Sequence, residues 1–346
     1  MNSVVRKSAI GFSLVLAAVL AGCGTPPAAG GNASTGPKNC MVTDVNGPDD
    51  RAFNQAAFTG LTEVAGDSGT PPTVVVSKTE ADYDGNVGAL VSQGCDIIVG
   101  VGFPLADAVS AAAAAAPDQN FALVDDVSEE PNVKSIVFDT QQASFLAGYA
   151  AASYSRAGVV GTYGGAQIPP IVQFMQGFAL GVQHFNEVHG ASVRVVGWNT
   201  DSQNGTFVGG FEANEKAKTT AVGVIDQGAD VIMPVGGPIF LAAAEAIKDS
   251  GKEIALIGVD SDAYVSAPEV KELFLTSVLK RVDTAVAKVA EDSNAGDFSA
   301  EEYVGTLEND GVGIAPFHDF ETKVSPELAA ELDEVAQSII DGSITF

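Results

Sequence analysis

Carboxylates, aromatic rings and one lysine stand where apolar stretches of this chain end. The members of this set are Asp44, Phe53, Asn54, Asp125, Phe207, Asp260 and Lys280. A single aspartate after a strand more often caps a helix than binds a ligand, and a single phenylalanine more often belongs to the core. Together, carboxylates that accept hydrogen bonds and rings that stack favour the binding of a polar, neutral, aromatic ligand.

Catalytic arrangements are not supported by residue spacing. His184 and His189 are five apart instead of the three or four that share a helix face, and His318 is remote, so a zinc site is not indicated. The sequence has no HExxH, G-x-S-x-G or Walker A motif. Gly100-Val101-Gly102 is followed by Leu105 where the dinucleotide fingerprint needs Gly or Ala, which favours a tight turn into a helix. We expect no enzymatic activity, no metal and no cofactor.

An internal repeat indicates how the chemical groups are positioned. The segment 94–102 (GCDIIVGVG) recurs as 228–236 (GADVIMPVG), and each copy is followed by a second apolar strand that ends in aspartate. Two similar halves predict two lobes with a cleft between them. Ligands of open parallel sheets bind beyond the carboxyl ends of the strands. At that edge we expect Gly102, Asp125, Gly236 and Asp260.

Apolar, β-branched stretches alternate with helical patterns along the chain, which predicts an α/β fold with two doubly wound parallel-sheet lobes. At 346 residues, the chain is long enough for two domains with separate cores. We expect strands at 40–45, 74–77, 95–101, 121–125, 135–138, 159–163, 193–198, 231–235, 254–259 and 273–278, and helices at 53–64, 105–116, 141–155, 171–185 and 326–342.

Three crossings between the lobes are predicted, and together they would form a hinge. The first precedes the helix at 141–155, the second follows Asp260 and returns 273–280 to the first lobe, and the third lies near 295–301. The expected N-terminal lobe is therefore 40–139 plus 263–300, and the expected C-terminal lobe is 140–262 plus 301–346.

The N-terminus has the layout of a secretory signal. Arg6 and Lys7 precede an apolar stretch too short to span a membrane permanently, and Leu-Ala-Gly-Cys23 follows. These four residues resemble the bacterial lipobox, which implies a signal peptide at 1–22 and lipid attachment at Cys23. An ordinary signal peptide with an incidental cysteine is the alternative. Residues 23–39, rich in Gly, Pro, Ser and Ala, predict a flexible tether that leaves the folded part on the extracytoplasmic side of the cell membrane.

Two further cysteines, Cys40 and Cys95, belong to an exported chain in which a disulfide can persist. If they open the first and third strands, the strand order 2-1-3 makes those strands neighbours, and a bridge is geometrically possible. Two free, buried thiols are the alternative.

The charge balance argues against nucleic acid as a partner. Removing Arg6 and Lys7 with the signal leaves 15 basic residues against 44 acidic ones, a formal net charge of −29. A phosphate-rich ligand needs a basic footprint, and no such cluster is present. A solvated acidic surface is the ordinary explanation of the excess.

A family resemblance extends over essentially the whole mature chain. Residues 44–60 (DVNGPDDRAFNQAAFTG) resemble the opening motif of the basic membrane protein (BMP) family, the purine-nucleoside-binding lipoproteins of bacterial ABC importers. The family often has two Gly in this loop and Ser before Phe-Asn, whereas this chain has Asn46-Gly47 and Arg51-Ala52. Further similar segments are 145–151 (FLAGYAA), 160–165 (VGTYGG), 174–182 (FMQGFALGV), the repeat from Gly228, 258–262 (GVDSD) and 276–280 (TSVLK).

The resemblance implies the type I periplasmic-binding fold with a purine nucleoside in the cleft. It implies that Phe53 and Phe207 sandwich the base, and stacking contributes about 1–3 kcal/mol per base. Asp125 would accept hydrogen bonds from the base edge, with Asp126 as a rival. Asp44 and Asn54 would line the same wall.

For the sugar, the resemblance implies that Asp260 and Lys280 take the ribose hydroxyls, with Gly236 letting the backbone come close. Lys280 would offset the desolvated charge of Asp260, and Asp125 would have no lysine partner.

The resulting expectation is a monomeric, lipid-anchored receptor that closes on a nucleoside and presents it to a membrane permease powered by an ATPase. A receptor of the same fold for a sugar or another small polar solute is one alternative. A surface antigen without a transport role is another, and a secreted hydrolase is disfavoured because no pair of nucleophile and base is legible.

Overall fold

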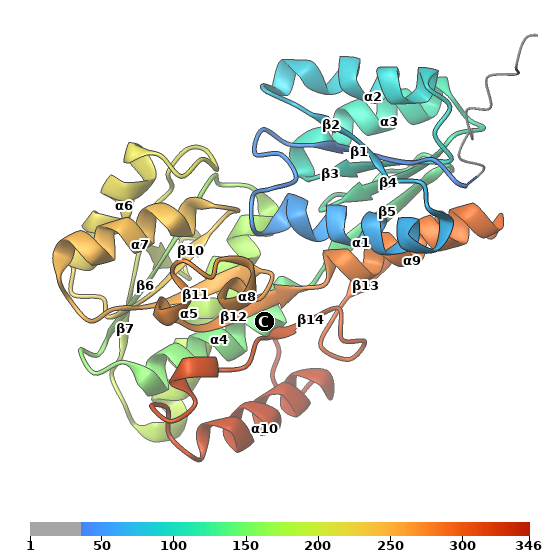
Figure 1. Cartoon of the computed structure of the whole chain (residues 1–346). Coiled ribbons are helices and arrows are strands. Elements are labelled where there is room, and N and C mark those ends of the chain that lie inside the picture. Colours follow the sequence, from blue (N-terminus) through green and yellow to red (C-terminus); the bar gives the residue numbers. More distant parts are fainter. Residues whose placement is uncertain (1–35) are drawn as a thin grey trace, which may run out of the picture. The chain divides into compact units, whose positions relative to one another are not determined.

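Two six-stranded sheets organise residues 36–346, the part of the chain that the computed structural model describes (Figure 1). The expected signal peptide at 1–22, the lipid site Cys23 and most of the expected tether lie outside the described residues. We call the two sheets, with the helices that cover them, lobe one and lobe two.

Lobe one is a parallel sheet with the strand order β13-β5-β4-β3-β1-β2, so the predicted 2-1-3 arrangement is present. Helices α1 and α9 pack together on one face and α2 and α3 on the other (Figure 1). The elements are β1 (Asn39–Thr43), α1 (Phe53–Ser68), β2 (Thr73–Val76), α2 (Tyr83–Ser92), β3 (Ile97–Val101), α3 (Ala106–Ala115), β4 (Asn120–Val124), β5 (Val133–Phe138), α9 (Val282–Ala295) and β13 (Tyr303–Gly305), with short 3₁₀ turns η1 (Glu80–Asp82) and η2 (Phe103–Leu105).

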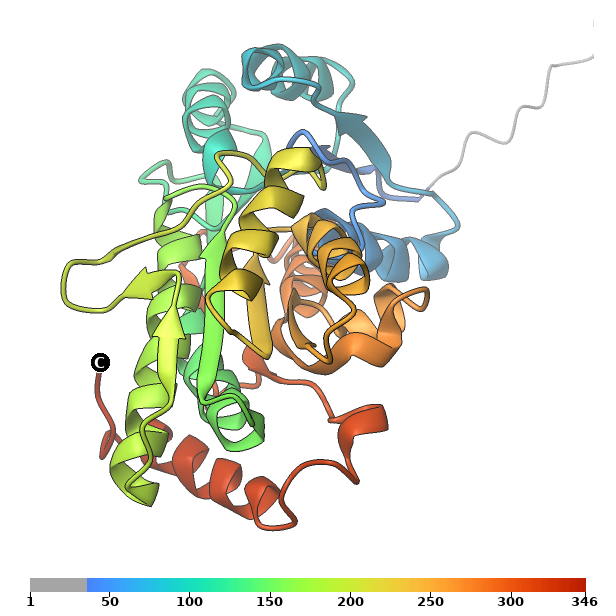
Figure 2. The same ribbon diagram turned by 90° about the vertical axis from the view of Figure 1, so that its left-hand side faces the viewer.

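Lobe two has the order β14-β12-β11-β10-β6-β7, and only β14 runs antiparallel to its neighbour. Helices α6 and α7 cover one face of this sheet and α4 and α5 the other (Figure 2). The elements are α4 (Thr140–Tyr154), β6 (Val159–Gly164), α5 (Pro169–His189), β7 (Arg194–Val196), the hairpin β8 (Trp198–Asn199) and β9 (Asn204–Gly205), α6 (Glu215–Asp226), β10 (Val231–Val235), α7 (Ile239–Ser250), β11 (Ala255–Asp260), α8 (Ala263–Ser266), η3 (Lys271–Leu273), β12 (Phe274–Lys280), β14 (Val312–Ile314), η4 (His318–Phe320) and α10 (Leu328–Ile340).

Helices α4 and α5 approach each other closely because their contact is made of small residues. A Cβ added at Gly148 would lie 1.9 Å from the Phe178 carbonyl oxygen, and one at Gly181 would lie 1.9 Å from the Phe145 carbonyl oxygen. Gly148 in α4 and Gly181 in α5 therefore serve packing, and the Ala-rich composition of α4 fits the same contact.

The chain crosses between the lobes after β5, after β12 and after β13. The predicted second crossing after Asp260 is wrong, because β12 pairs in parallel with β11 inside lobe two. Gly258 leaves room for Ser277, whose Oγ lies 2.5 Å from where a Cβ would stand, so the two strands fit side by side. The predicted third crossing near 295–301 is also wrong, because the three-residue strand β13 first pairs with β5 in lobe one.

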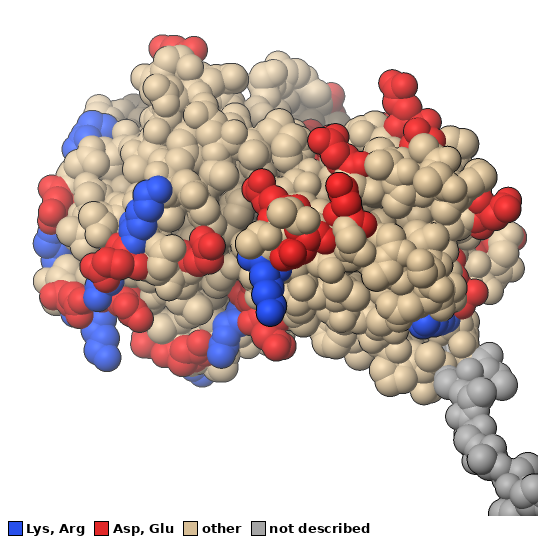
Figure 3. Space-filling view, turned by 90° about the horizontal axis from the view of Figure 1, so that it is seen from above, with Lys and Arg blue, Asp and Glu red and all other residues tan. Residues whose placement is uncertain are grey.

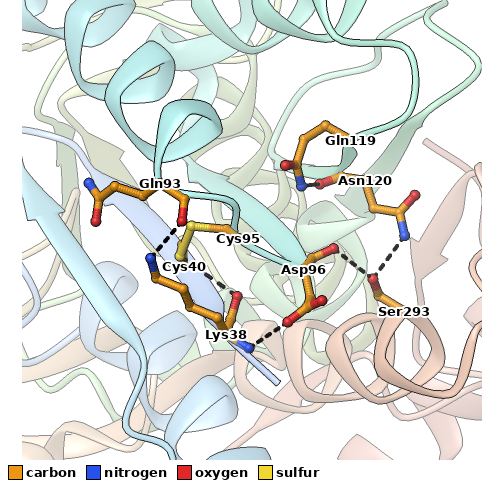
Figure 4. Close-up of a disulfide and its surroundings, with 8 residues drawn as sticks. All are labelled: Lys38, Cys40, Gln93, Cys95, Asp96, Gln119, Asn120 and Ser293. Carbon is orange, nitrogen blue, oxygen red and sulfur yellow. Dashed lines mark hydrogen bonds between the residues drawn. A yellow bond between two sulfur atoms is a disulfide. The ribbon is translucent and has the colours of Figure 1, made fainter. Parts of the chain in front are cut away.

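Cys40 and Cys95 form a disulfide between the entry ends of β1 and β3 (Figure 4). Cys95 stands just before β3 instead of opening it. The neighbouring Asp96 carboxylate accepts a hydrogen bond from the Lys38 amide (2.6 Å), and the Asp96 carbonyl accepts one from Ser293 Oγ in α9 (3.2 Å). With a sequence separation of 55 between the cysteines, a bridge of this kind stabilises a fold by about 4 kcal/mol in the chain-entropy picture.

Candidate functional site

A cleft lies at the carboxyl ends of the strands, with walls from both lobes. It encloses about 530 Å³ of empty space, part of which is open to solvent. Its lining is aromatic and acidic, and Lys280 is its single basic side chain within the described residues. The lining residues are Asp44, Asn46, Asp50, Phe53, Gly102, Phe103, Pro104, Asp125, Ile168, Pro170, Ile171, Phe174, Phe211, Val235, Gly236, Gly237, Val259, Asp260 and Lys280.

Lobe one contributes what we call the first corner, formed by Phe53, Gly102 and Asp125. Gly102 follows β3 with a positive φ of 119°, and a Cβ there would lie 3.4 Å from Cε1 of Phe53. Asp125 follows β4 with a φ of 75°, a left-handed conformation that few residues other than glycine adopt. The turn at Asp125 brings its carboxylate to the cleft, and the missing Cβ at Gly102 leaves room for the Phe53 ring.

Lobe two contributes an equivalent second corner, formed by Phe211, Gly236 and Asp260. Gly236 follows β10 with a φ of 137°, and a Cβ there would lie 2.8 Å from Cδ1 of Phe211. Asp260 ends β11 with a φ of 70°. The repeat seen in the sequence therefore delivers a glycine and an aspartate from each lobe, and each glycine lies beside a ring from outside the repeat.

The first corner carries a buried ion pair that spans the lobes. Lys280 Nζ lies 2.5 Å from Oδ1 and 2.6 Å from Oδ2 of Asp125, and the two side chains are 2% and 11% exposed. The ammonium also lies 4.7 Å from the ring centroid of Phe53. The expectation that Asp125 has no lysine partner is therefore wrong, and Lys280 forms its ion pair with Asp125 instead of Asp260. In the β11–β12 register Asp260 stands opposite Leu279, so Lys280 lies beyond the end of β11 and extends across the cleft.

Asp260 is consequently a buried carboxylate without a hydrogen-bond donor among the described residues. The residue is 6% exposed, and no group within residues 36–346 donates a hydrogen bond to its side chain. Burial raises the pKa of Asp260 from 3.8 to about 7, and the nearby Lys280 charge offsets only part of this effect. An acceptor of this kind can take hydroxyl donors from a ligand.

Asp44 and Asn54 belong to a buried network at the start of α1. Asn54 Nδ2 donates to Asp44 Oδ1 (2.8 Å) and to Asp50 Oδ2 (2.9 Å). Burial raises the pKa of Asp44 from 3.8 to about 6. Asp44 lines the cleft, whereas Asn54 is fully buried and does not, so Asn54 acts by orienting the two carboxylates.

Asp50 lines the cleft and was missed in the sequence analysis. Its carboxylate accepts hydrogen bonds from the amides of Ala52, Asn54 and Gln55 at 2.9–3.0 Å. These are the unpaired donors of the first helical turn, so Asp50 caps α1. An aspartate just before an apolar helical pattern is the sequence signal that could have identified it.

Phe207 does not line the cleft, and its assignment to the sandwich is wrong. Its backbone forms an isolated β-bridge to Gly164 at the end of β6. Its ring packs edge-on against Trp198, with 6.4 Å between the ring centroids. Four residues later, Phe211 takes the position in the cleft. Gly165 admits this ring, because a Cβ at Gly165 would lie 2.4 Å from its Cδ1.

Asp125 lines the cleft, and its neighbour Asp126 lies outside it. Asp126 accepts the Val127 amide (2.8 Å) and faces an adjacent hollow. The apolar wall formed by Ile168, Ile171 and Phe174 was also not predicted, because a periodic helix pattern does not separate core residues from those that face a cleft.

A metal-binding cluster and a membrane-spanning helix are both absent from the described residues. Residues 36–346 contain no group of three or more His, Cys, Asp or Glu side chains placed to hold a metal ion. Over the same residues, no helix has the length and apolar character needed to cross a membrane. In Figure 3 acidic side chains are spread over the visible face, with basic ones interleaved mainly over the lobe-two side. This face lacks a continuous basic surface for nucleic acid.

Comparisons with known proteins agree on one family. Residues 38–345 match the Bmp family, described as "ABC transporter substrate-binding protein PnrA-like". The ABC transporter nucleoside-binding protein BmpA of Lactococcus lactis subsp. cremoris is 32% identical over 99% of this chain and 98% of its own length. A CD4+ T-cell-stimulating antigen of Listeria monocytogenes is 32% identical over 88% of this chain and 86% of its own length.

Solved structures give the same fold. An ABC transporter system solute-binding protein from Aeropyrum pernix K1 superposes with a TM-score of 0.79 at 26% identity, covering 90% of this chain and 93% of that one. A solute-binding protein from Conexibacter woesei has a TM-score of 0.68 at 20% identity over 89% of this chain and 98% of that one, which bears on the fold alone. The architecture is the type I periplasmic-binding-protein fold.

Proposed function

The chain belongs to the Bmp family of PnrA-like ABC transporter substrate-binding proteins, and we propose that it captures a purine nucleoside in the cleft and delivers it to a membrane permease. Substrate-binding proteins are not enzymes. The name of the Lactococcus relative, a nucleoside-binding protein, supports the ligand class proposed here.

The observation that carries this proposal is the buried carboxylate of Asp260, which has no donor within the described residues. Burying an unpaired charge is unfavourable unless a partner satisfies it. The two hydroxyls of a ribose can both donate hydrogen bonds to this carboxylate and so provide the missing partners. We therefore assign the ribose to Asp260, with Gly236 beside it in the second corner.

The base is assigned to the space between Phe53 and Phe211, one ring from each lobe. Both rings line the cleft, and each faces a glycine that leaves room for it. Stacking on two rings supports any purine, whereas hydrogen bonds to the base edge select among purines. Asp125 and Asp44 are the proposed acceptors for such bonds, since a carboxylate has about four acceptor positions and Lys280 occupies only part of those on Asp125.

The charge of the cleft favours a ligand without phosphate. Four aspartates line it, and the single lysine is already neutralised by Asp125. A phosphate would meet carboxylates without a free cation to compensate it, so nucleotides should bind far more weakly than nucleosides.

The cellular setting completes the proposal. Cleavage after Gly22 would leave Cys23 as a lipid-bearing first residue, with 23–39 as a tether outside the cytoplasm. The monomeric receptor would then close on its ligand and present it to a permease coupled to an ATPase. Metabolic labelling with palmitate, compared between the wild type and Cys23→Ala, tests the anchor.

A thermal-shift panel of nucleosides, free bases, pentoses and nucleotides tests the ligand class. Ligand at a hundred times its Kd adds about 2.7 kcal/mol of stability, which raises Tm measurably. We expect adenosine, inosine or guanosine to raise Tm, with free ribose and the 5′-monophosphates giving much smaller shifts. A shift with ribose and none with any nucleoside would replace this proposal by a sugar receptor.

A further inference from the structure

Arg51 stands in the loop between β1 and α1 of lobe one, yet its partners are in lobe two. Its Nη1 donates hydrogen bonds to Glu269 Oε2 (2.9 Å) and to the Ser266 carbonyl (3.2 Å). Its own carbonyl accepts hydrogen bonds from Ser266 Oγ (2.7 Å) and Ser261 Oγ (3.3 Å). Backbone and side chain of one residue therefore both contact the other lobe.

The conformation of Arg51 is unusual for a residue with a side chain. Its φ is 64°, in the left-handed region that glycine occupies at lowest cost. Asp50 on one side is held by the cap of α1, and Ala52 on the other side is buried. With its neighbours fixed in this way, the left-handed turn directs the carbonyl and the guanidinium of Arg51 towards lobe two.

The contact is placed next to the proposed ribose acceptor. Ser261 directly follows Asp260, and Ser266 and Glu269 lie in and just after α8. On the lobe-one side, Arg51 directly follows the cleft residue Asp50. Opening the cleft at this edge would have to break these hydrogen bonds, because their two ends belong to different lobes.

We propose that Arg51 is a positioning residue that joins the β1–α1 loop to 261–269 and thereby sets how long a ligand stays enclosed. This inference rests on the proposed function, in which the lobes close on a nucleoside. The pair is half exposed, with side-chain exposures of 40% for Arg51 and 45% for Glu269, so its contribution is modest and sensitive to salt.

The test compares Arg51→Gln with Lys218→Gln in the full chain. Lys218 in α6 pairs with Asp249 (2.7 Å) and Glu245 (3.6 Å) in α7, so this control removes one positive charge and its ion pairs within a single lobe. Adenosine and inosine are the probes, and association and dissociation are measured by stopped flow.

We expect Arg51→Gln to speed nucleoside release about two- to five-fold, the size of an exposed ion pair, with little change in the association rate. In 1 M salt, where screening extends only about 3 Å, the difference from the wild type should shrink. Lys218→Gln should release ligand at the wild-type rate. Exchanging the charges, Arg51→Glu with Glu269→Arg, should recover part of the effect.

Hydrogen exchange without ligand separates this inference from the proposed function. In Arg51→Gln, amides of 261–269 should exchange faster than in the wild type, and Lys218→Gln should leave them unchanged. If the wild type binds no nucleoside, the proposed function fails, while the exchange result still tests the contact. Unchanged exchange together with unchanged release rates would overturn the role of Arg51.

Discussion

At the first corner of the cleft the strand-end aspartate is paired with Lys280, whereas no residue of 36–346 donates a hydrogen bond to the equivalent aspartate of the second corner. The two corners share their construction: a glycine of positive φ beside a ring, and an aspartate in the left-handed region. One lysine from β12 makes them different. A repeated fold thus supplies two equivalent positions. The Lys280 side chain crosses between the lobes and pairs with the carboxylate of the first corner, and no described residue pairs with that of the second.

Removing the lysine should produce the largest effect. In Lys280→Met the buried Asp125 loses its partner, and breaking one side of a buried pair typically costs about 3–5 kcal/mol. We expect Tm to fall by roughly 5–10 °C. Lys288→Met, which removes an exposed ion pair with Asp292 on α9, is the matched control and should change Tm little. If Lys280→Met is as stable as its control, the ion pair between Lys280 and Asp125 does not stabilise the fold, and the account of how the two corners differ fails.

The aromatic rings provide the next test, because the corners should contribute similarly to base stacking. Phe53→Ala and Phe211→Ala should each weaken nucleoside binding by about 1–3 kcal/mol, roughly five- to 150-fold. Phe207→Ala should leave affinity near the wild-type value, since that ring packs beside Trp198. Titration calorimetry measures all three. Loss of affinity in Phe207→Ala with none in Phe211→Ala would restore the original assignment.

Substituting the two strand-end glycines should weaken ligand binding to different degrees. The loss should be larger where the added Cβ comes closer to the neighbouring ring. Gly236→Ala places a Cβ 2.8 Å from Phe211, whereas Gly102→Ala places one 3.4 Å from Phe53. Both substitutions strain the backbone, by about 1–3 kcal/mol, but only the first also displaces a ring. We expect Gly236→Ala to weaken binding about tenfold and Gly102→Ala less. The reverse order would show that ring placement does not limit affinity at the second corner.

The smallest effects should be those of pH on stability and on nucleoside affinity. As pH rises, stability should fall and affinity should increase. Because burial raises the pKa of Asp260 from 3.8 to about 7, the folded state binds more protons than the unfolded state between these values. The ligand-free protein should therefore lose stability as pH rises from about 4 to 7. Nucleoside affinity should instead increase over pH 6–8, since ribose hydroxyls donate best to the ionised carboxylate.

The Asp260→Asn variant separates the contribution of Asp260 to the pH dependence of stability from that of the other carboxylates. The variant should have a shallower dependence of Tm on pH, by a few degrees, than the wild type between pH 5 and 8. Asp44, with its pKa raised to about 6, remains in both proteins and contributes a slope in the same direction. Identical pH profiles for the two proteins would mean that Asp260 does not titrate in this range.

The sequence was sufficient for the lobes, the strand order and most corner residues, because these follow from local patterns and from an internal repeat. It could not identify Phe211, because the loop before that ring folds back on lobe two through tertiary hydrogen bonds from the Gly209 and Gly210 amides to the Gly165 carbonyl. It also misassigned the partner of Lys280, since that depends on the register of β12 against β11. Strand β13 has only three residues, which is too short for a recognisable strand pattern, so the last crossing between the lobes could not be placed from the sequence.

The most direct test of the account is a thermodynamic cycle between the ribose hydroxyls and Asp260. Adenosine and 2′,3′-dideoxyadenosine are titrated into the wild type, Asp260→Asn and Asp125→Asn; asparagine tolerates the left-handed backbone at both positions. We predict that the wild type prefers adenosine by about ten- to 100-fold, as hydrogen bonds to a charged group imply. Asp125→Asn should keep this preference and Asp260→Asn should lose most of it. An undiminished preference in Asp260→Asn would contradict the account.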